Sequence, residues 1–519
     1  MRVESQGAVP LRRAGRIPTV IAATVGAAST ACGPHATEVA DASTTLSRET
    51  LMDPATCGGC HPAQYQAWQQ SMHALASDDP VFVAMNARGQ RDTGGRLGTF
   101  CATCHAPMAV GDSVTTDGLN LSTLVAGYRG VTCFFCHTVN QVTGTHDGAV
   151  ALADDLVMRG EYDNPIPSAA HGAEYSVLHD GEQSASAGFC GACHDVVVPQ
   201  TDAAVERTFT EWSHSAFAGS GGATCIECHM TASPQAGPIA DVGGVPDRTL
   251  HDHRLAAVDV PFAGSFVDAG TDAVVDELSG ALQGALCVTG AGGIRVVLDP
   301  VGIGHGWPSG ATQDRRAWTE VVASTGGTVF YQSGVVPPDV AVGEENGDPD
   351  LWLLRDCMVD ANGDPVDMLW QAAASAGNEL PALATFDMLD PAFYMSHVFQ
   401  RFPNDGSPLS QYPDEVTLRV RLQPIGLDVL ADLEGSGDLD AAAVASMPTF
   451  DVSLTGPGGA DLTWTPQAAA SLTYLSDDGT PATCVATEGF NIAATKVLAG
   501  PACGGLASAL HPSSASPSP

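Results

Sequence analysis

The sequence predicts two domains of different class, an N-terminal domain of short helices and irregular segments followed by a mostly β, sandwich-like domain. Hydrophobic periodicity is poor between residues 51 and 259, where short helical patterns alternate with loops rich in Gly, Asp and Pro. From about residue 261 onward, apolar residues instead recur at every second position, and Gly and Pro end these runs. The clearest alternating runs are 294–298, 416–422 and 450–454, and one short helix is expected at 427–433. The predicted domains are therefore residues 51–259 and residues 260–505.

The first 32 residues have the features of an export signal. Four arginines among the first 16 residues precede an apolar stretch at 17–28, which is too short to span a membrane. Small residues at 29–31 and then Cys32 indicate a lipoprotein whose lipidated N-terminus is Cys32; ordinary cleavage nearby would leave a stray thiol instead. We expect a signal peptide at 1–31 and an exported, periplasmic or outer-surface protein, attached to the membrane only through its lipid anchor.

The regions flanking the two domains have simple compositions. Residues 32–50 are expected to form a linker, and residues 506–519, which end in a Ser/Pro-rich stretch, a disordered tail.

The charge balance restricts the partners of the chain. Its 519 residues carry 59 Asp and Glu against 21 Lys and Arg, a formal net charge of −38. Binding to nucleic acid requires a basic surface, so a nucleic-acid partner is not expected.

A motif of five residues, Cys-x-x-Cys-His, occurs five times, although the Cys and His content of the chain would produce it about 0.01 times by chance. Two thiols three positions apart can form thioethers with the two vinyl groups of one haem, and the following imidazole can bind its iron. The five motifs are Cys57-Gly-Gly-Cys60-His61, Cys101-Ala-Thr-Cys104-His105, Cys133-Phe-Phe-Cys136-His137, Cys190-Gly-Ala-Cys193-His194 and Cys225-Ile-Glu-Cys228-His229.

Other uses of paired cysteines agree less well with this pattern. A zinc site needs no His directly after every second Cys, and five pairs would leave one pair unmatched. A thioredoxin-like motif would occur once, at a strand–helix junction. The sequence therefore predicts five covalently bound c-type haems. Because aromatic residues make up only 6% of the chain, we expect these haems to fill the core of residues 51–259.

Haems that carry electrons usually have a second axial ligand, His or Met, on the other side of the iron. The His content outside the motifs is sufficient for this. The local sequences favour His73, His171, His253 and His305 as distal ligands; His253 shares the segment His-Asp-His with His251, and one of that pair is expected to face solvent. Less favoured are His146, His179, His214 and His397.

Four cysteines lie outside the motifs in the predicted β domain, and an even number in an exported domain suggests two disulfides. Proximity in the sequence favours Cys484–Cys503, which leaves Cys287–Cys357, but three connectivities are open.

Several segments resemble the multihaem cytochrome c family that includes the tetrahaem electron acceptor of hydroxylamine oxidoreductase. The resemblance rests on the first motif with Tyr65, Trp68 and Ser71-x-His73-Ala74, and on the surroundings of the third, fourth and fifth motifs. It also includes Gly304-His305 with Pro308-Ser309-Gly310, in a loop whose His is thought to reach back to a haem in larger members of the family. The resemblance covers about residues 51–320. It implies an electron-transfer domain of stacked haems, with distal roles for His73, His171 and His305. The fifth motif and the C-terminal β domain are additions to the pattern of the small carrier.

Three functions remain open at this point. The first is an exported pentahaem cytochrome that passes single electrons between redox partner proteins without catalysing a reaction of its own. The second is a multihaem oxidoreductase that acts on a small nitrogen or sulfur compound at one haem with an open coordination position. In the third, the β domain is a binding module that docks the haem domain onto a partner complex or an insoluble acceptor.

Overall fold

The computed structural model describes residues 45–166, 168–262, 266–343, 346–455, 461–469, 473–475, 481–492, 497–500 and residue 503. The predicted signal peptide, Cys32 and the C-terminal tail lie outside these residues. Within them, no helix is long and apolar enough to cross a membrane.

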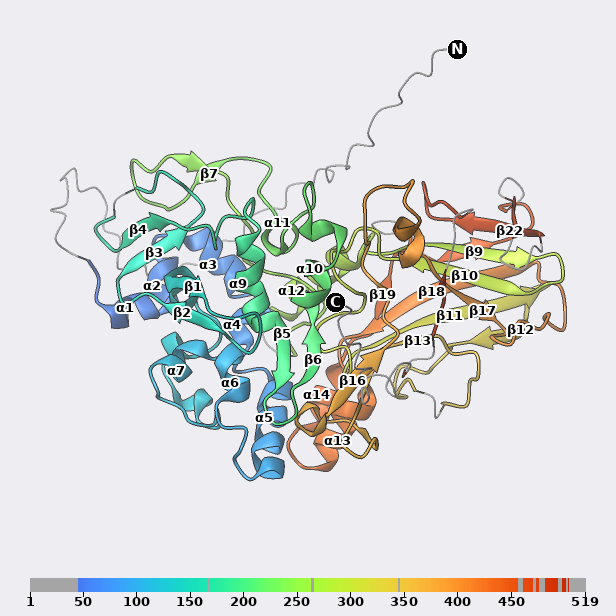
Figure 1. Ribbon diagram of the computed structural model, residues 1–519, viewed down its shortest axis with the longest axis horizontal. Coiled ribbons are helices and arrows are strands. Elements are labelled where there is room, and N and C mark those ends of the chain that lie inside the picture. The colour runs from blue at the N-terminus through green and yellow to red at the C-terminus, as the bar shows by residue number, and fades with distance from the viewer. Residues whose placement is uncertain are drawn as a thin grey trace, which may run out of the picture. The chain divides into compact units, whose positions relative to one another are not determined.

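The first half of the described chain consists mainly of short helices, coloured blue to green in Figure 1. They are α1 (Arg48–Met52), α2 (Pro54–Gly58), α3 (Pro62–Trp68), α4 (Met72–Leu75), α5 (Pro80–Thr93), α6 (Phe100–His105), α7 (Pro107–Gly111), α8 (Cys133–Thr138), α9 (Ala185–His194), α10 (Thr208–Ser213) and α11 (Cys225–His229). Polar caps fix where several of them begin. The Asp79 side chain accepts hydrogen bonds from the Val81 and Phe82 amides at the start of α5, both at 2.9 Å.

Pairs of short strands connect these helices. The pairs are β1 (Val139–Val142) with β2 (Val150–Leu152), β3 (Val157–Gly160) with β4 (Gly172–Tyr175), β5 (Asp195–Val198) with β6 (Ala203–Arg207), and β7 (Gly237–Pro238) with β8 (Asp247–Arg248). The β3–β4 pair is parallel and the others are antiparallel.

The second half contains two larger sheets. One has the order β21 (Thr473–Leu475), β22 (Pro481–Ala486), β9 (Gln283–Thr289), β10 (Ile294–Asp299), β17 (Val398–Phe402), β23 (Val497–Leu498). The other has the order β12 (Thr328–Ser333), β11 (Arg316–Thr325), β18 (Glu415–Gln423), β19 (Phe450–Val452), with β13 (Leu353–Leu354) paired to β11 and β20 (Leu462–Trp464) paired to β18. The alternating sequence runs predicted for this half correspond to β10, β18 and β19.

One hydrophobic core takes residues from both of these sheets. Leu286 and Val296 come from β9 and β10, and Leu418 and Trp464 come from β18 and β20. Each of these four side chains is almost completely buried. The alternating pattern of β18 therefore places one set of side chains in a shared interior, as period-two runs predict.

Smaller elements complete this half. Strands β14 (Asp356–Val359), β15 (Pro365–Val366) and β16 (Ala374–Gly377) form a third sheet, and the helices are α12 (Val267–Leu278), α13 (Leu427–Gly435) and α14 (Ala441–Ser446). The short helix expected at 427–433 is confirmed as α13.

The helical and strand-rich regions share buried contacts. Val81 of α5 and Leu97 belong to the same apolar cluster as Trp370, Leu430 and Leu433. Helices α13 and α14 (orange) accordingly lie beside α5 (blue) in Figure 1. The coarse prediction, a helical N-terminal region followed by a region rich in strands, is confirmed, whereas the domain boundaries at 51, 259 and 505 stay predictions.

Two disulfides stabilise the strand-rich region, but their connectivity differs from the one favoured by sequence. Cys287 of β9 pairs with Cys484 of β22, and Cys357 of β14 pairs with Cys503. The favoured pairs, Cys484–Cys503 and Cys287–Cys357, are wrong because β22 lies directly beside β9, with Cys484 opposite Cys287. This neighbour relation spans 197 residues and leaves no local signal in the sequence.

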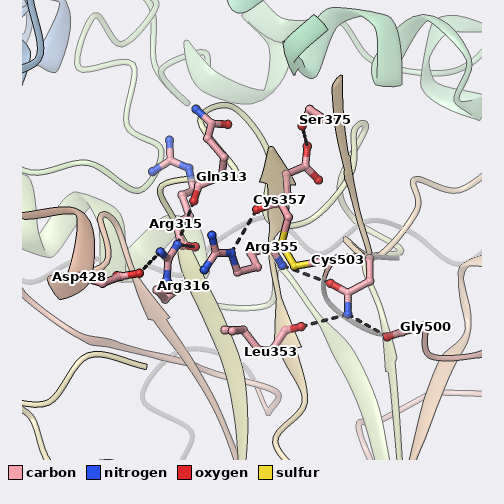
Figure 2. The surroundings of a disulfide bond; sticks show 12 residues. Gln313, Arg315, Arg316, Leu353, Arg355, Cys357, Ser375, Asp428, Gly500 and Cys503 are labelled. Atoms are coloured by element: carbon pink, nitrogen blue, oxygen red, sulfur yellow. Dashed lines mark hydrogen bonds and ion pairs between the residues drawn. A yellow bond between two sulfur atoms is a disulfide. The ribbon is translucent and has the colours of Figure 1, made fainter. Parts of the chain in front are cut away.

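Cys503 ends a chain segment that is bound to the strands around Cys357 (Figure 2). The Asn378 amide donates hydrogen bonds to the carbonyl oxygens of Leu353 and Gly500, both at 3.0 Å. The disulfide attaches Cys503 to β14, and the Asn378 amide connects Gly500 with β13, so the last described residues are bound to two neighbouring strands of different sheets.

Candidate haem-binding sites

All five Cys-x-x-Cys-His motifs lie on or at the ends of short helices. The last four occupy α6, α8, α9 and α11, and the first begins in α2, with His61 at the start of α3. One helical turn brings the two thiols to the same side of the helix, with the imidazole directly after them. None of the ten motif cysteines forms a disulfide. The local geometry therefore agrees with attachment of one haem to each motif.

In four motifs the imidazole is oriented by a backbone carbonyl from a distant segment. Nδ1 of the histidine lies 2.8 Å from the Ile239 oxygen for His61, 2.9 Å from Ala76 for His105, 2.5 Å from Arg159 for His137 and 2.9 Å from Ala256 for His229. A nitrogen that faces a carbonyl oxygen must carry the proton, so the lone pair lies on Nε2. Such a hydrogen bond is the usual support of a metal-bound histidine.

Three of the five motif histidines, His61, His194 and His229, face a second histidine ring that lies outside the motifs. The ring centres are 6.3 Å apart for His61 and His171, 6.0 Å for His194 and His73, and 6.3 Å for His229 and His305. Two imidazoles that bind one metal ion from opposite sides, at about 2.0–2.1 Å each, have ring centres about 6 Å apart. The residues present at these three motifs therefore fit a haem iron with two histidine ligands.

Two of the facing histidines, His73 and His305, are also in the protonation state that binds iron. Burial lowers the pKa of His73 to about 3 and the pKa of His305 to about 4, so both are neutral at pH 7. Nδ1 of His171 and Nδ1 of His305 each donate to the carbonyl of the following glycine at 2.8 Å, which leaves Nε2 available.

Two further histidines lie near His137. The His179 ring is stacked on the His137 ring with centres 5.6 Å apart, but its Nε2 already donates to the Cys136 carbonyl at 2.8 Å. His253 is close enough that its charge lowers the pKa of His137, after burial and the charge of His179. Its Nδ1 donates to the His251 carbonyl at 2.9 Å, the same orientation as in the other candidate ligands. His253 thus presents the nitrogen that iron needs, whereas His179, which the sequence did not favour, is the nearer ring.

His105 has a different neighbour. The ring stacked on it belongs to Phe82 of α5, with centres 4.2 Å apart and planes inclined by 14°. A phenyl ring has no atom that can bind iron. Because the lone pair of Nε2 lies in the plane of the imidazole, a ring stacked on its face does not occupy the direction in which His105 would bind iron. This contact is not predictable from local sequence, because residues 82 and 105 lie on different helices.

The remaining histidines among the described residues have other partners. Both ring nitrogens of His251 are engaged, by the Met230 carbonyl at 2.7 Å and by Glu161 at 2.9 Å. His397 is buried against Asp299 in the strand-rich region, with Nε2 at 2.7 Å. His146 and His214 are exposed and bind local groups through Nδ1. We therefore do not assign these four histidines as haem ligands, and His73, His171, His253 and His305 stay the predicted distal ligands.

Thiols of different motifs lie next to one another. Cys57 interacts with Cys133, Cys104 with Cys193, and Cys190 with Cys225. The first motif is therefore a neighbour of the third, and the fourth is a neighbour of both the second and the fifth. Haems attached at adjacent thiols would have their porphyrin edges close together.

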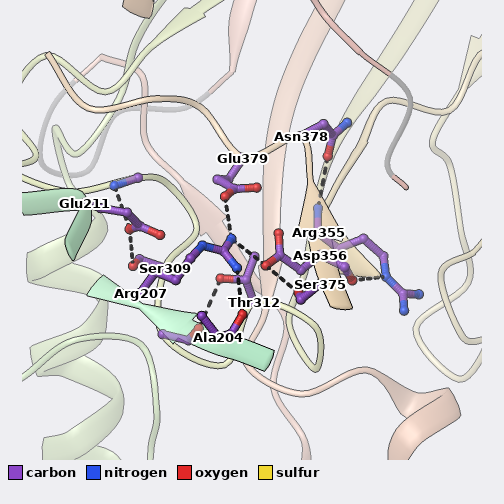
Figure 3. A network of polar contacts seen from close by, with 12 residues as sticks. Ala204, Arg207, Glu211, Ser309, Thr312, Arg355, Asp356, Ser375, Asn378 and Glu379 are labelled. Carbon is purple, nitrogen blue, oxygen red and sulfur yellow. Dashed lines mark hydrogen bonds and ion pairs between the residues drawn. The ribbon is translucent and has the colours of Figure 1, made fainter. Parts of the chain in front are cut away.

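The loop that carries His305 comes from the strand-rich region and is bound to helix α10. The Glu211 carboxylate accepts hydrogen bonds from the Gly306 amide at 3.0 Å and from the Ser309 hydroxyl at 2.7 Å. Figure 3 shows Glu211 and Ser309 in contact at the edge of a larger polar network. This contact fixes the backbone beside His305.

Arg207 of β6 is the cation at the centre of that network (Figure 3). One of its terminal nitrogens lies 2.6 Å from Asp356 and 2.9 Å from Glu379, both in the strand-rich region. Burial, followed by the charge of Asp356, raises the pKa of Glu379 to about 7. The helical and strand-rich regions are thus joined by a buried cluster in which one carboxyl group keeps its proton well above its usual range.

Comparison with known proteins agrees with this geometry. Residues 56–138, which include the first three motifs, match the family model described as cytochrome c554 and c-prime. The resemblance to the multihaem cytochromes c is confirmed. A penta-heme cytochrome c552 from Thermochromatium tepidum is similar in structure, with a TM-score of 0.52 and 18% sequence identity, over 81% of this chain and 98% of that chain. At this identity the likeness concerns the fold of the multihaem cytochrome alone. Comparison with curated protein sequences gives no significant match.

The orientation of the two histidines near His137 leads to a spectroscopic prediction. Replacing His253 by alanine is expected to convert one haem from low-spin to high-spin, because Nε2 of His253 is free to bind iron. The matched control is His179→Ala, which is expected to leave that haem low-spin, since Nε2 of His179 donates to a carbonyl. Electron paramagnetic resonance of the oxidised variants measures both. A high-spin signal in the His179 variant alone would reverse the assignment.

The raised pKa of Glu379 predicts a pH dependence of stability. Between about pH 4.5 and pH 7 the unfolded chain ionises this group while the folded protein still holds the proton, so rising pH lowers stability. Glu379→Gln keeps an acceptor for Arg207 but cannot ionise. Its thermal midpoint, relative to the wild-type protein, is therefore expected to rise between pH 5 and pH 8. Glu182→Gln, at an exposed position, serves as the control; equal pH profiles for all three proteins would contradict the prediction.

Proposed function

We propose that this chain is an exported pentahaem cytochrome that carries single electrons through five covalently bound haems, most of them with two histidine ligands. The observation that carries this proposal is the set of three histidine pairs whose ring centres are 6.0–6.3 Å apart at the first, fourth and fifth motifs. His137 with His253 is the fourth pair that we infer. Two ligands from the protein leave an iron without an open position, which favours electron transfer over chemistry on a bound substrate.

The adjacent thiols support a route for the electrons. We infer that electrons pass from the haem of the first motif to that of the third, and then to those of the fourth and fifth. The step from the third to the fourth motif rests on the influence of Cys136 on the pKa of Cys190, and the other steps rest on the thiol contacts. The second motif branches from the fourth, through Cys104 and Cys193. When bound, each haem supplies a reversible one-electron site, and the protein supplies ligands, spacing and exclusion of water.

Export is supported by the two disulfides, since such bonds persist in oxidising compartments. We infer a periplasmic or outer-surface location, with membrane attachment through a lipid on Cys32, and unidentified donor and acceptor proteins as partners. We also infer that the two larger sheets form a β-sandwich, because their side chains share one core.

The haem content tests this proposal. The purified holoprotein is expected to have the mass of the processed chain plus five haems, a pyridine haemochrome ratio of five per chain, and low-spin signals from four of the five irons. A colourless protein, or one with fewer than five haems per chain after expression with the haem-attachment machinery, would refute the pentahaem assignment.

A second function is favoured by one contact. The ring contact of His105 is with Phe82, stacked on its face, and not with a second histidine as in the three pairs above. We infer that a haem at this motif has an open coordination position, as an oxidoreductase acting on a small nitrogen or sulfur compound would need.

Ligand binding distinguishes the two functions. If the second motif is open, cyanide or nitric oxide is expected to bind one haem per chain and to shift its absorption band. A wild-type protein that binds neither molecule would exclude the oxidoreductase and leave the electron carrier.

A further inference from the structure

An apolar surface is exposed in one loop of the strand-rich region, between Leu383 and the 3₁₀ helix at Pro391–Ser396. Large apolar side chains usually avoid water, and several in a single loop indicate a contact surface. Leu389 is 92% exposed, so its side chain touches almost nothing. The exposed apolar side chains of this surface, called the 386–395 patch here, are Phe386, Met388, Leu389 and Met395.

The loop is held in place despite this exposure. The Ala216 amide donates a hydrogen bond to the Leu383 carbonyl at 2.7 Å, and the Leu383 side chain is buried. The Tyr394 hydroxyl donates to the Met388 carbonyl at 3.0 Å, which closes the loop on itself. The patch is thus presented on a defined backbone.

The 386–395 patch is continuous with the fifth haem site. The Phe386 ring meets the Phe217 ring edge to face, with centres 5.1 Å apart. Phe217 in turn lies against Gly304, where a Cβ atom would be 3.4 Å from it. The next residue is His305, whose ring faces His229 of the fifth motif. One aromatic side chain, that of Phe217, and one glycine therefore separate the patch from the proposed distal ligand.

Carboxylates lie within the patch. Asp387 and Asp390 are both exposed, and the chain as a whole carries a formal charge of −38. A second copy of this chain and an anionic membrane surface carry the same sign and would be repelled. A basic partner would instead be attracted, and charge of this kind raises the rate of encounter between redox proteins.

We propose that the 386–395 patch is the docking surface for a small basic electron-transfer protein, which exchanges electrons with the haem of the fifth motif. This proposal rests on the proposed electron-carrier function. The apolar side chains would contact the partner's exposed cofactor edge, and Asp387 and Asp390 would contact its surrounding lysines. One electron passes from one haem iron to the partner's metal, so one centre is oxidised and the other reduced, with no bond formed or broken.

The experiment uses a lysine-rich monohaem cytochrome c as the probe. The dithionite-reduced holoprotein, freed of excess reductant, is mixed with the oxidised probe in a stopped-flow instrument at low ionic strength. We expect Leu389→Arg to lower the second-order rate at least fivefold, because it places a positive charge in the patch. Leu389→Ser is expected to lower it less, and added salt should reduce the difference between wild type and Leu389→Arg.

Val125→Arg is the matched control, because Val125 is also an exposed apolar residue, at 71%, but lies in the helical region. Its rate is expected to stay within twofold of wild type, with haem spectra unchanged in all variants. Equal rates for Leu389→Arg and Val125→Arg would overturn the docking surface while leaving electron transfer intact. A wild-type protein that cannot reduce the probe would instead contradict the proposed function. A dimer in sedimentation that Leu389→Arg dissociates would assign the patch to a second copy and overturn the proposal.

Discussion

The helical region depends on imidazole rings that come from distant parts of the chain and face each other about 6 Å apart. His61 meets His171, His73 meets His194, and His229 meets His305. The buried apolar residues of this region are divided among several clusters instead of forming one core. A metal centre between two such rings would act as a cross-link, which explains how a region with poor hydrophobic periodicity can hold a defined fold.

The features that could be read from the sequence are local. Cys-x-x-Cys-His is complete within five residues, so its chemistry and its place on a helix follow from the pattern alone. Period-two runs likewise located β10, β18 and β19. In β18 and β19 the apolar residues at every second position are the buried ones, whereas all six residues of β10 are buried, so its alternating run marked the strand but not a solvent-facing side.

The features that could not be read depend on which segments meet. Cys287 and Cys484 lie opposite each other only because β22 pairs with β9. The position of Phe82 beside His105 depends on how α5 packs against α6. Whether His179 or His253 is the better candidate ligand near His137 depends on which ring nitrogen of each is bonded to a backbone carbonyl. The resemblance to multihaem cytochromes did bring His73, His171 and His305 forward, since a family pattern carries information about contacts that a single chain lacks.

The position of His305 has a consequence for how the molecule matures. Ribosomes deliver the chain from its N-terminus, so every haem-attachment motif is made before the loop that faces His229 exists. A nascent or clipped chain that ends before this loop keeps all ten thiols but lacks that imidazole. In the pentahaem protein proposed above, completion of the fifth centre would therefore require that the strand-rich region has been made and has folded, and an unfinished chain would carry an iron with one histidine ligand only.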